Sequence, residues 1–210
     1  MTTQLPPSLL SLLGQGKPNE YISVVDKNVR HFDVFLDGEI EAPNEYRELL
    51  SILFNAGEDD TINIFINSPG GHLDTALAIA EGLKNTNAHV VAVLIGACHS
   101  AASIISMYCH EVAVLDNAYS MVHTASFGAH GSTGNVKAHT EFTVKQVEKL
   151  LNDTYEGFLN KDELSKVKSG VELWFDADDI RKRMEHRIKF LTQKVKKLQK
   201  QADQLTVDEK

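Results

Sequence analysis

The sequence has few of the features that mark secreted, membrane-spanning or metal-binding proteins. Its 210 residues include only two cysteines, Cys98 and Cys109, in or beside apolar stretches, so a reducing compartment is favoured over a disulfide framework. No apolar run approaches the roughly 18 residues that span a bilayer, and no basic residue precedes the apolar N-terminal stretch. The nine histidines show no metal-ligand spacing. We therefore expect a cytoplasmic protein with no membrane segment, no metal and no cofactor of its own.

Composition and charge favour one globular domain with extensions. A hydrophobic content of 42% in 210 residues is enough to build a full core. The net charge is −8, but residues 181–200 carry nine Lys or Arg and one Glu, so the other 190 residues together carry −16. Only one aromatic residue, Phe190, lies among these basic residues, and no nucleic-acid-reading motif accompanies them. We interpret this stretch as a solvated helix face, and nucleic-acid binding is not expected.

Short β-rich runs alternate with helical patterns through most of the chain. This order predicts an α/β fold with a mostly parallel sheet and right-handed crossovers. The expected strands lie at 31–36, 62–66, 89–95, 112–115 and 119–123, and the expected helices at 45–55, 72–85, from near 100, and at about 135–159. The last helix is too long to pack only on a small core, so it is expected to project or to reach a partner.

The C-terminal stretch has a heptad-like apolar seam. Its members follow one another at spacings of three, four or seven residues: Ile180, Met184, Ile188, Leu191, Val195, Leu198 and Leu205. Polar residues surround the seam almost completely, which favours a self-associating coiled coil over a helix docked on its own domain. The chain is thus divided into an N-terminal arm at 1–28, an α/β domain at 29–177 and a basic helix at 178–210.

Ser100 and His123 form a candidate catalytic pair. Ser100 lies in GACHSAASI directly after one apolar strand, and His123 closes another strand 23 residues later. A serine hydroxyl is a poor nucleophile at neutral pH unless an imidazole accepts its proton, and two strands of one sheet can bring the two groups together. Upstream, the glycines of Ser68-Pro69-Gly70-Gly71 let backbone amides point into a cavity, where they can hold an oxyanion. These segments predict a site at the strand ends.

The residues beside the serine are weaker candidates. His99 directly precedes Ser100, so its side chain is expected to point away from the serine hydroxyl. Cys98 is expected to face the sheet rather than to act as a thiol nucleophile. Plainer alternatives are that Ser100 only caps a helix, that His123 is a hydrogen-bonded core histidine, and that the glycine pair only makes a turn.

Several of these motifs occur together in a known family. VFLDGEI, INSPGG, the turn at 96–100, the MVH strand and the long helix that follows resemble the proteolytic subunit of the Clp protease, including viral Clp-like proteases, over about 34–177. INSPGG alone would leave the wider crotonase-like superfamily of acyl-CoA enzymes open, and Ser100 followed by MVH favours the peptidases. The resemblance implies a ClpP/crotonase-like fold with a handle helix. It also implies a homo-oligomeric ring, either a heptamer or two heptamers stacked face to face to give fourteen subunits.

The resemblance also implies a role for each matching residue. Ser100 would be the nucleophile and His123 the general base, and the amides of Gly71 and Ala101 would form the oxyanion hole. The residues expected beside the bound peptide are Gly70, Thr124 and Gly128.

Two departures from the family pattern concern the end of the chain. Where the family has its catalytic aspartate, counting back from Ala177 in the LWFDA step leads to Glu172, whose carboxylate can also orient an imidazole. Asp176 is the alternative third residue, and it also suits the N-cap of the helix that follows. The family usually ends after a short exit strand, whereas this chain continues into the basic helix at 178–210.

The expected function is a serine endopeptidase that forms an acyl-enzyme and meets ATP only through a partner AAA+ unfoldase. Three alternatives stay open. One is a viral head-maturation protease in which the C-terminal helix binds scaffold or capsid protein. The second is a catalytically inactive assembly protein of the same fold, and the third is a crotonase-like acyl-CoA enzyme.

Overall fold

A mixed six-stranded sheet forms the centre of the molecule. The computed structural model describes residues 29–208, without the side chains of 205–208, so the arm expected at 1–28 lies outside the described residues. The strands are β1 (His31–Leu36), β2 (Thr61–Ser68), β3 (His89–His99), β4 (Glu111–Val114), β5 (Tyr119–Val122) and β6 (Leu173–Asp176). Their order is β1-β2-β3-β5-β6, with β4 also paired to β3, and only the β5–β6 pair is antiparallel. The predicted α/β fold with a mostly parallel sheet is confirmed.

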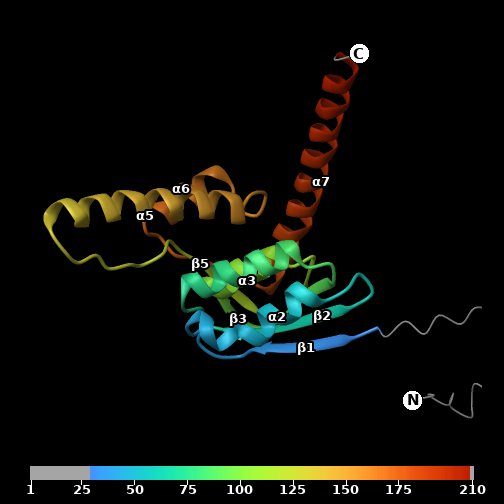
Figure 1. The fold of residues 1–210 in the computed structure, drawn as a ribbon, viewed down its shortest axis with the longest axis horizontal. Helices are drawn as coiled ribbons and strands as arrows, with labels where there is room; N and C mark the ends of the chain where they lie inside the picture. Colours follow the sequence, from blue (N-terminus) through green and yellow to red (C-terminus); the bar gives the residue numbers. More distant parts are fainter. Residues whose placement is uncertain (1–28, 209–210) are drawn as a thin grey trace, which may run out of the picture.

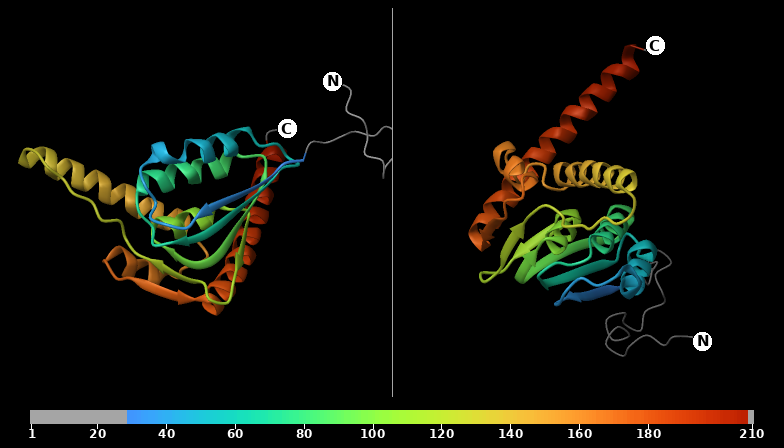
Figure 2. Two further views of the ribbon diagram at one scale, coloured as in Figure 1. Left: turned by 90° about the horizontal axis from the view of Figure 1, so that it is seen from below. Right: turned by 90° about the vertical axis from the view of Figure 1, so that its left-hand side faces the viewer.

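The hydrophobic core lies on one face of this sheet. Alternate residues of β2 are fully buried, and the parallel register sets them beside the buried residues of β3, as in Ile64 beside Ala92 and Ile66 beside Leu94. The helices α2 (Arg47–Asn55), α3 (Leu73–Asn85) and α4 (Ala101–Tyr108) contribute buried residues to the same core, and α2 and α3 lie over the sheet in Figure 2. A short helix η1 (Pro43–Tyr46) precedes α2, so the helix expected at 45–55 is divided in two.

Apolar side chains remain exposed on the other face. Phe35 of β1 stacks on Phe65 of β2 with ring centroids 4.9 Å apart, and Phe35 stays exposed. Tyr119 of β5 and Trp174 of β6 are exposed as well. These aromatics alternate with the core residues along their strands, and their exposure leaves apolar surface for contact with another molecule.

Two helices and a connecting turn follow the sheet strands. The helix α5 (Thr133–Thr154) projects from the body in Figure 1, and it starts two residues before and ends five residues before the predicted helix at 135–159. It ends early because the following turn packs Tyr155 and Phe158 into the core. The helix α6 (Lys161–Lys168) starts at a capping box of Asn160 and Glu163. Neither α6 nor β6 was predicted.

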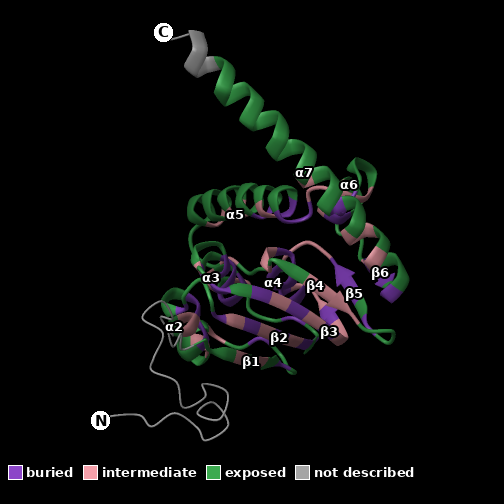
Figure 3. Ribbon diagram, turned by 90° about the vertical axis from the view of Figure 1, so that its right-hand side faces the viewer, coloured by how far each residue is buried: buried purple, intermediate pink, exposed green. Residues whose placement is uncertain are grey.

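The helix α7 (Ala177–Asp208) is docked at its start and free further on. Ile180 is 1% exposed, and the buried Arg187 donates hydrogen bonds to the carbonyls of Thr154, Glu156 and Met107 at 2.6, 2.9 and 3.3 Å. Two of these carbonyls lie in the last turns of α5 and α4, where the helix dipole favours a cation. Beyond Arg187 the helix extends away from the body and is mostly exposed (Figure 3), although Leu191 is half-buried and Lys194 still pairs with Glu156 of the domain. The sequence analysis favoured a coiled coil over a helix docked on its own domain, and this prediction is wrong for the first three turns of α7.

Within residues 29–208, no helix combines the length and the apolar character that crossing a membrane would require.

Candidate active site

Ser100 forms the turn between β3 and α4 by itself. Its backbone has φ 52° and ψ −119°, and among the described residues it is the only non-glycine residue with a positive φ. Such a conformation costs on the order of 1–3 kcal/mol and persists only where the surroundings hold it. Here its amide donates to Met121 O at 2.8 Å, and its carbonyl accepts from Ile104 N and Ser103 Oγ at 3.1 and 2.7 Å. A strained strand-to-helix turn of this kind presents a serine hydroxyl at the end of a sheet.

His123 meets that hydroxyl from the neighbouring strand. The parallel register of β3 and β5 pairs Cys98 with Ser120 and His99 with Met121, so the residues just beyond these strands also lie side by side. His123 follows the last residue of β5, and its Nε2 lies 2.7 Å from Ser100 Oγ. This is a hydrogen bond in which an imidazole can take the serine proton. The structure therefore brings together the two residues that the sequence paired.

Two backbone amides beside Ser100 are available to a substrate. The amides that flank Gly71 are used, since Gly70 N donates to Ser68 Oγ and His72 N to Ile40 O, but Gly71 N donates to no acceptor in the described chain. Ala101 is the first residue of α4, and its amide likewise has no acceptor among residues 29–208. Both residues line a cavity of about 400 Å³ together with Ser100 and His123. Donors so placed can stabilise a negative oxygen beside the serine.

The glycine pair is required by close packing and does more than make a turn. Gly70 has φ +95°, and a Cβ on it would lie 2.8 Å from Ser100 Cβ and 2.7 Å from His99 O. Gly71 has φ +150°, and a Cβ on it would lie 2.2 Å from Ile40 O. A side chain at either position would collide with backbone atoms, so the chain approaches Ser100 this closely only through glycine.

Glu172 lies near His123 by register but does not contact it. The antiparallel pairing sets Leu173 beside Val122, so one further step places Glu172 beside His123. Its side chain is exposed, and no hydrogen bond in the described chain joins it to the imidazole. Asp176 pairs with Tyr119, roughly 13 Å further along the strand, and its carboxylate accepts from Asp179 N at 2.9 Å as the N-cap of α7. The position favours Glu172, and Asp176 has the capping role.

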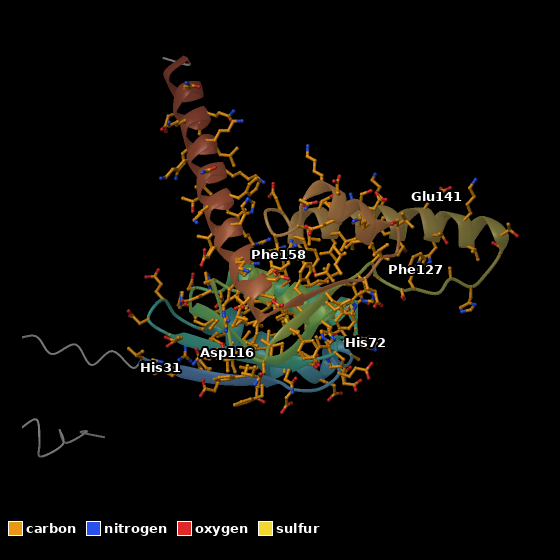
Figure 4. The ribbon with its side chains drawn as sticks, turned by 180° about the vertical axis from the view of Figure 1, so that it is seen from behind. His31, His72, Asp116, Phe127, Glu141 and Phe158 are labelled. Atoms are coloured by element: carbon orange, nitrogen blue, oxygen red, sulfur yellow. The ribbon has the colours of Figure 1, made fainter. Side chains whose placement is uncertain are left out.

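The three residues expected beside the peptide lie at different distances from the serine. Gly70 packs under Ser100, as described above. Thr124 follows His123 and lines a smaller cavity of about 210 Å³, which shares Ala125 and Val147 with the first cavity. Gly128 is on the exposed connection to α5 and lines neither cavity. Nearby on this connection, Phe127 lies under α5 with its ring 6.1 Å from that of His139 (Figure 4).

Several lining residues of the cavity were missed by the sequence analysis. They are apolar side chains from α3, α4 and α5: Leu73, Ile104, Val147, Leu150 and Leu151. The sequence shows them only as members of apolar helix stripes, and such a stripe looks the same whether it borders a cavity or fills a core.

His99 and Cys98 are both turned away from the cavity. His99 makes edge contacts with the rings of Tyr119 and Trp174, with centroids 4.9 and 5.1 Å away. Its Nε2 is buried without a hydrogen-bond partner in the described part of the chain, and burial lowers the pKa of the imidazole. Burial raises the pKa of the Cys98 thiol to about 12, which keeps it protonated and weakly nucleophilic.

Among residues 29–208, His, Cys, Asp and Glu side chains do not gather in any group of three or more that could hold a metal ion. The side chains that line the cavity and can take part in chemistry are the hydroxyls of Ser100 and Ser126, the imidazoles of His123 and His72, and the carboxylate of Glu39.

Comparison with known families supports the same interpretation. A sequence model of the Clp protease family matches residues 16–182, which is most of the chain. The chain belongs to the Clp protease family. This family implies protein substrates and, typically, oligomeric assembly. The match ends in the second turn of α7, so most of that helix lies outside the family pattern.

Proposed function

We propose that this Clp protease is a serine endopeptidase with Ser100 as nucleophile and His123 as general base. The observation that carries the proposal is the 2.7 Å hydrogen bond between His123 Nε2 and Ser100 Oγ. The strained backbone of Ser100 adds to it, because strain of 1–3 kcal/mol, as an order of magnitude, is found mostly at functional positions.

The proposed reaction passes through an acyl-enzyme. Ser100 Oγ attacks the peptide carbonyl carbon while His123 Nε2 takes its proton, and the carbonyl oxygen becomes an oxyanion. The amides of Gly71 and Ala101 donate to this oxyanion, and each such donor contributes about 3 kcal/mol to transition-state stabilisation. His123 then returns the proton to the leaving amine, and it activates a water molecule that releases the acyl group from Ser100.

Glu172 is proposed as the third member of the catalytic set. A carboxylate beside the second imidazole nitrogen would fix the tautomer of His123 and stabilise its charged form. The β5–β6 register supports this role, because it sets Glu172 beside His123. Catalytic hydrogen bonds are often long or poorly aligned in the absence of substrate. We therefore propose that the hydrogen bond between Glu172 and His123 forms in the assembled, substrate-bound enzyme.

The surroundings of Ser100 suggest how a peptide binds. The cavity beside the serine has apolar side chains such as Leu73, Ile104 and Leu150, which favours an apolar substrate side chain next to the cleaved bond. The peptide would lie as an extended strand beside the turn at Gly70 and Gly71 and pass close to Thr124. The connection that contains Gly128 would border the peptide further away.

Assembly into a cytoplasmic ring of seven or fourteen copies is part of the proposal. The apolar residues Phe142 and Val144 are exposed on the projecting α5, and aromatic side chains are exposed on the sheet. Uncovered apolar surface of this kind is typical of subunit contacts. The ring would receive substrates from an ATP-driven unfoldase. The alternative, which α7 favours, is a ring that acts on viral capsid or scaffold proteins bound through that helix.

Labelling with a fluorophosphonate tests the proposal directly. We expect the assembled protein to be modified on Ser100, found by mass spectrometry of the labelled peptide, and the Ser100→Ala variant to remain unlabelled. His123→Ala should slow labelling at least a hundredfold, because the proton acceptor is lost. An assembled, folded protein that is not labelled would contradict the proposal. A catalytically inactive assembly protein is the second candidate, because no hydrogen bond in the described chain joins Glu172 to His123, and a failure to label would favour it.

A further inference from the structure

The apolar stripe of α7 continues beyond the domain on which the helix is docked. Ile180, Met184, Ile188, Leu191, Val195 and Leu198 follow one another at spacings of three or four residues and so lie on one side of the helix. Ile180 is 1% exposed against the domain, whereas Ile188, Val195 and Leu198 are 61%, 52% and 54% exposed. The stripe thus passes from a covered to an uncovered part, and the uncovered part belongs to the exposed length of α7 in Figure 3.

The uncovered part has the pattern of a two-helix interface. Counted in heptads, Ile188, Val195 and Ala202 occupy one core position, and Leu191, Leu198 and Leu205 occupy the other. The helix also needs no partner in order to form, since its first turns are already built on the domain and helix propagation is far easier than nucleation. A pairing over about 18 residues, or roughly 27 Å, therefore does not bear the cost of nucleating the helix.

We propose that residues 188–205 of α7 pair with the same residues of a second copy of this chain, and that the two helices are antiparallel. In this register Ile188 lies opposite Leu205, Leu191 opposite Ala202 and Val195 opposite Leu198. The same three layers recur on the other side of a twofold axis between residues 196 and 197. Every apolar residue at the two core positions is then covered, while Phe190 lies outside them, beside Gly157 of its own domain.

Docking of the first turns decides the orientation. In a parallel pair, residues 177–187 of the second helix would lie beside residues 177–187 of the first, on the side where Ile180 and Arg187 already pack against their own domain. An antiparallel partner avoids this space, because its helix approaches the domain with its free end and its own domain lies at the far end of α7. The isolated apolar pattern does not distinguish the two orientations, but the docked first three turns of the helix do.

The charges of α7 are compatible with a copy of itself. The lysines at 189, 196, 197 and 200 fall outside the two core positions and the positions that flank them. In the antiparallel register the flanking residues bring Thr192 near Gln199 and Lys194 near Gln201, so like charges do not meet. Lys194 is held in addition by Glu156 of its own domain, with Nζ to carboxylate distances of 2.8 and 2.6 Å. The pairing does not depend on the proposed peptidase activity.

Disulfide trapping between full-length chains tests both the contact and its direction. Leu191→Cys and Ala202→Cys are made as separate variants and oxidised alone and as a mixture, with the unsubstituted chain as control for Cys98 and Cys109. We expect a crosslinked dimer only in the mixture. In the antiparallel pair Leu191 and its own copy are about 16 Å apart along the axis, beyond disulfide reach. Crosslinking of each variant with itself would show a parallel pair and overturn the proposal, and no crosslink in any sample would overturn it as well.

A measurement of particle mass in solution gives a second test. Val195→Lys places a charge in the proposed interface, and Gln193→Lys places the same charge on the opposite side of the helix. We expect Val195→Lys to halve the particle mass, whatever the size of the ring, and Gln193→Lys to leave it unchanged, with both variants retaining their helix content by circular dichroism. An unchanged mass for Val195→Lys, or an equal loss in both variants, would overturn the proposal.

Discussion

At the scale of single residues, the candidate site depends on backbone conformations that few side chains permit. Ser100 holds a positive φ, and the chain at Gly70 passes close enough to touch its Cβ. The two features are coupled, because atoms added at Gly70 would push directly on the turn that carries the hydroxyl. The sequence showed a serine, a histidine and a glycine pair, but it did not show that Ser100 is strained or that Gly70 supports it.

Gly70→Ala should therefore damage both the fold and the activity. The new Cβ would meet His99 O at 2.7 Å and Ser100 Cβ at 2.8 Å, at a φ that alanine rarely adopts. We expect a loss of about 2 kcal/mol in unfolding free energy and at least tenfold slower fluorophosphonate labelling of Ser100. Gly38→Ala is the matched control, since a Cβ there meets nothing within 4 Å. Equal behaviour of the two variants in urea unfolding and labelling would show that Gly70 has no such role.

Substitution of Glu172 should lower activity, whereas substitution of Asp176 should lower stability. Glu172→Gln should lower kcat/KM for peptide hydrolysis by about 10²- to 10⁴-fold and leave stability nearly unchanged, since a charge that orients the imidazole is lost. Asp176→Ala should reduce the unfolding free energy by about 1 kcal/mol through loss of the α7 cap, with little change in kcat/KM. The opposite assignment of effects would make Asp176 the third catalytic residue.

His99 should make the protein sensitive to mild acid. Burial lowers the pKa of the imidazole in the folded protein, while the unfolded chain has the ordinary value of about 6.5. The unfolded state therefore binds the proton more readily, so stability is lost as the pH falls below about 6.5 towards the lower folded pKa. His99→Phe removes this effect and the unpaired Nε2, and the unfolding free energy should fall less steeply between pH 7 and pH 5.

Part of the acid sensitivity should remain in that variant. His110 is still present, and the pKa of its imidazole is lowered by burial and by the nearby His89. Labelling of Ser100 should continue in His99→Phe, because His99 does not line the cavity beside Ser100. An unchanged pH profile, or loss of labelling, would contradict this account.

At the scale of secondary structure, most elements were predictable from the sequence, and two short ones, α6 and β6, were not. The strands at 31–36 and 112–115 and the helix at 72–85 were placed within one residue of their observed limits. The strand β6 has only four residues and α6 only eight, with a single buried residue in each, so hydrophobic periodicity has almost nothing to act on. One local signal for α6 was present, because Asn160 and Glu163 have the spacing of a capping box.

Arg187 should be the residue that attaches α7 to the domain. Its guanidinium is buried and donates to three carbonyls, two in the last turns of α4 and α5 and one in the turn that follows α5. Its removal would leave these acceptors unpaired. We expect Arg187→Leu to cost about 3 kcal/mol in urea unfolding, since hydrogen bonds from charged donors are strong. Lys189→Leu removes an exposed charge two residues further along the same helix and should cost almost nothing. Similar losses in both variants would remove the anchoring role.

At the scale of the whole molecule, the candidate pair of Ser100 and His123 was easier to predict from the sequence than the cavity wall around it. Ser100 and His123 follow from strand order, because adjacent parallel strands bring their ends together. The cavity wall was not predictable, since Val147 and Leu150 line the cavity beside Ser100 only through the way α5 packs against α4. The two projecting helices were visible as patterns, and only the structure shows that both leave apolar side chains uncovered.

Phe142 should be a subunit contact on the projecting α5. Phe142 is 63% exposed and borders a cavity of about 530 Å³ between α3 and α5, an arrangement that leaves apolar surface in water unless another subunit covers it. We expect Phe142→Lys to reduce the particle mass at least twofold in light scattering while the helix content is retained. Glu141→Lys is the control, because it changes the charge of the adjacent exposed residue by even more but removes no apolar surface. The exposed ion pair of Glu141 with Lys137 contributes little, so the particle mass of this variant should stay unchanged. If both variants keep the full mass, or both lose it, α5 does not bind a neighbouring subunit through Phe142.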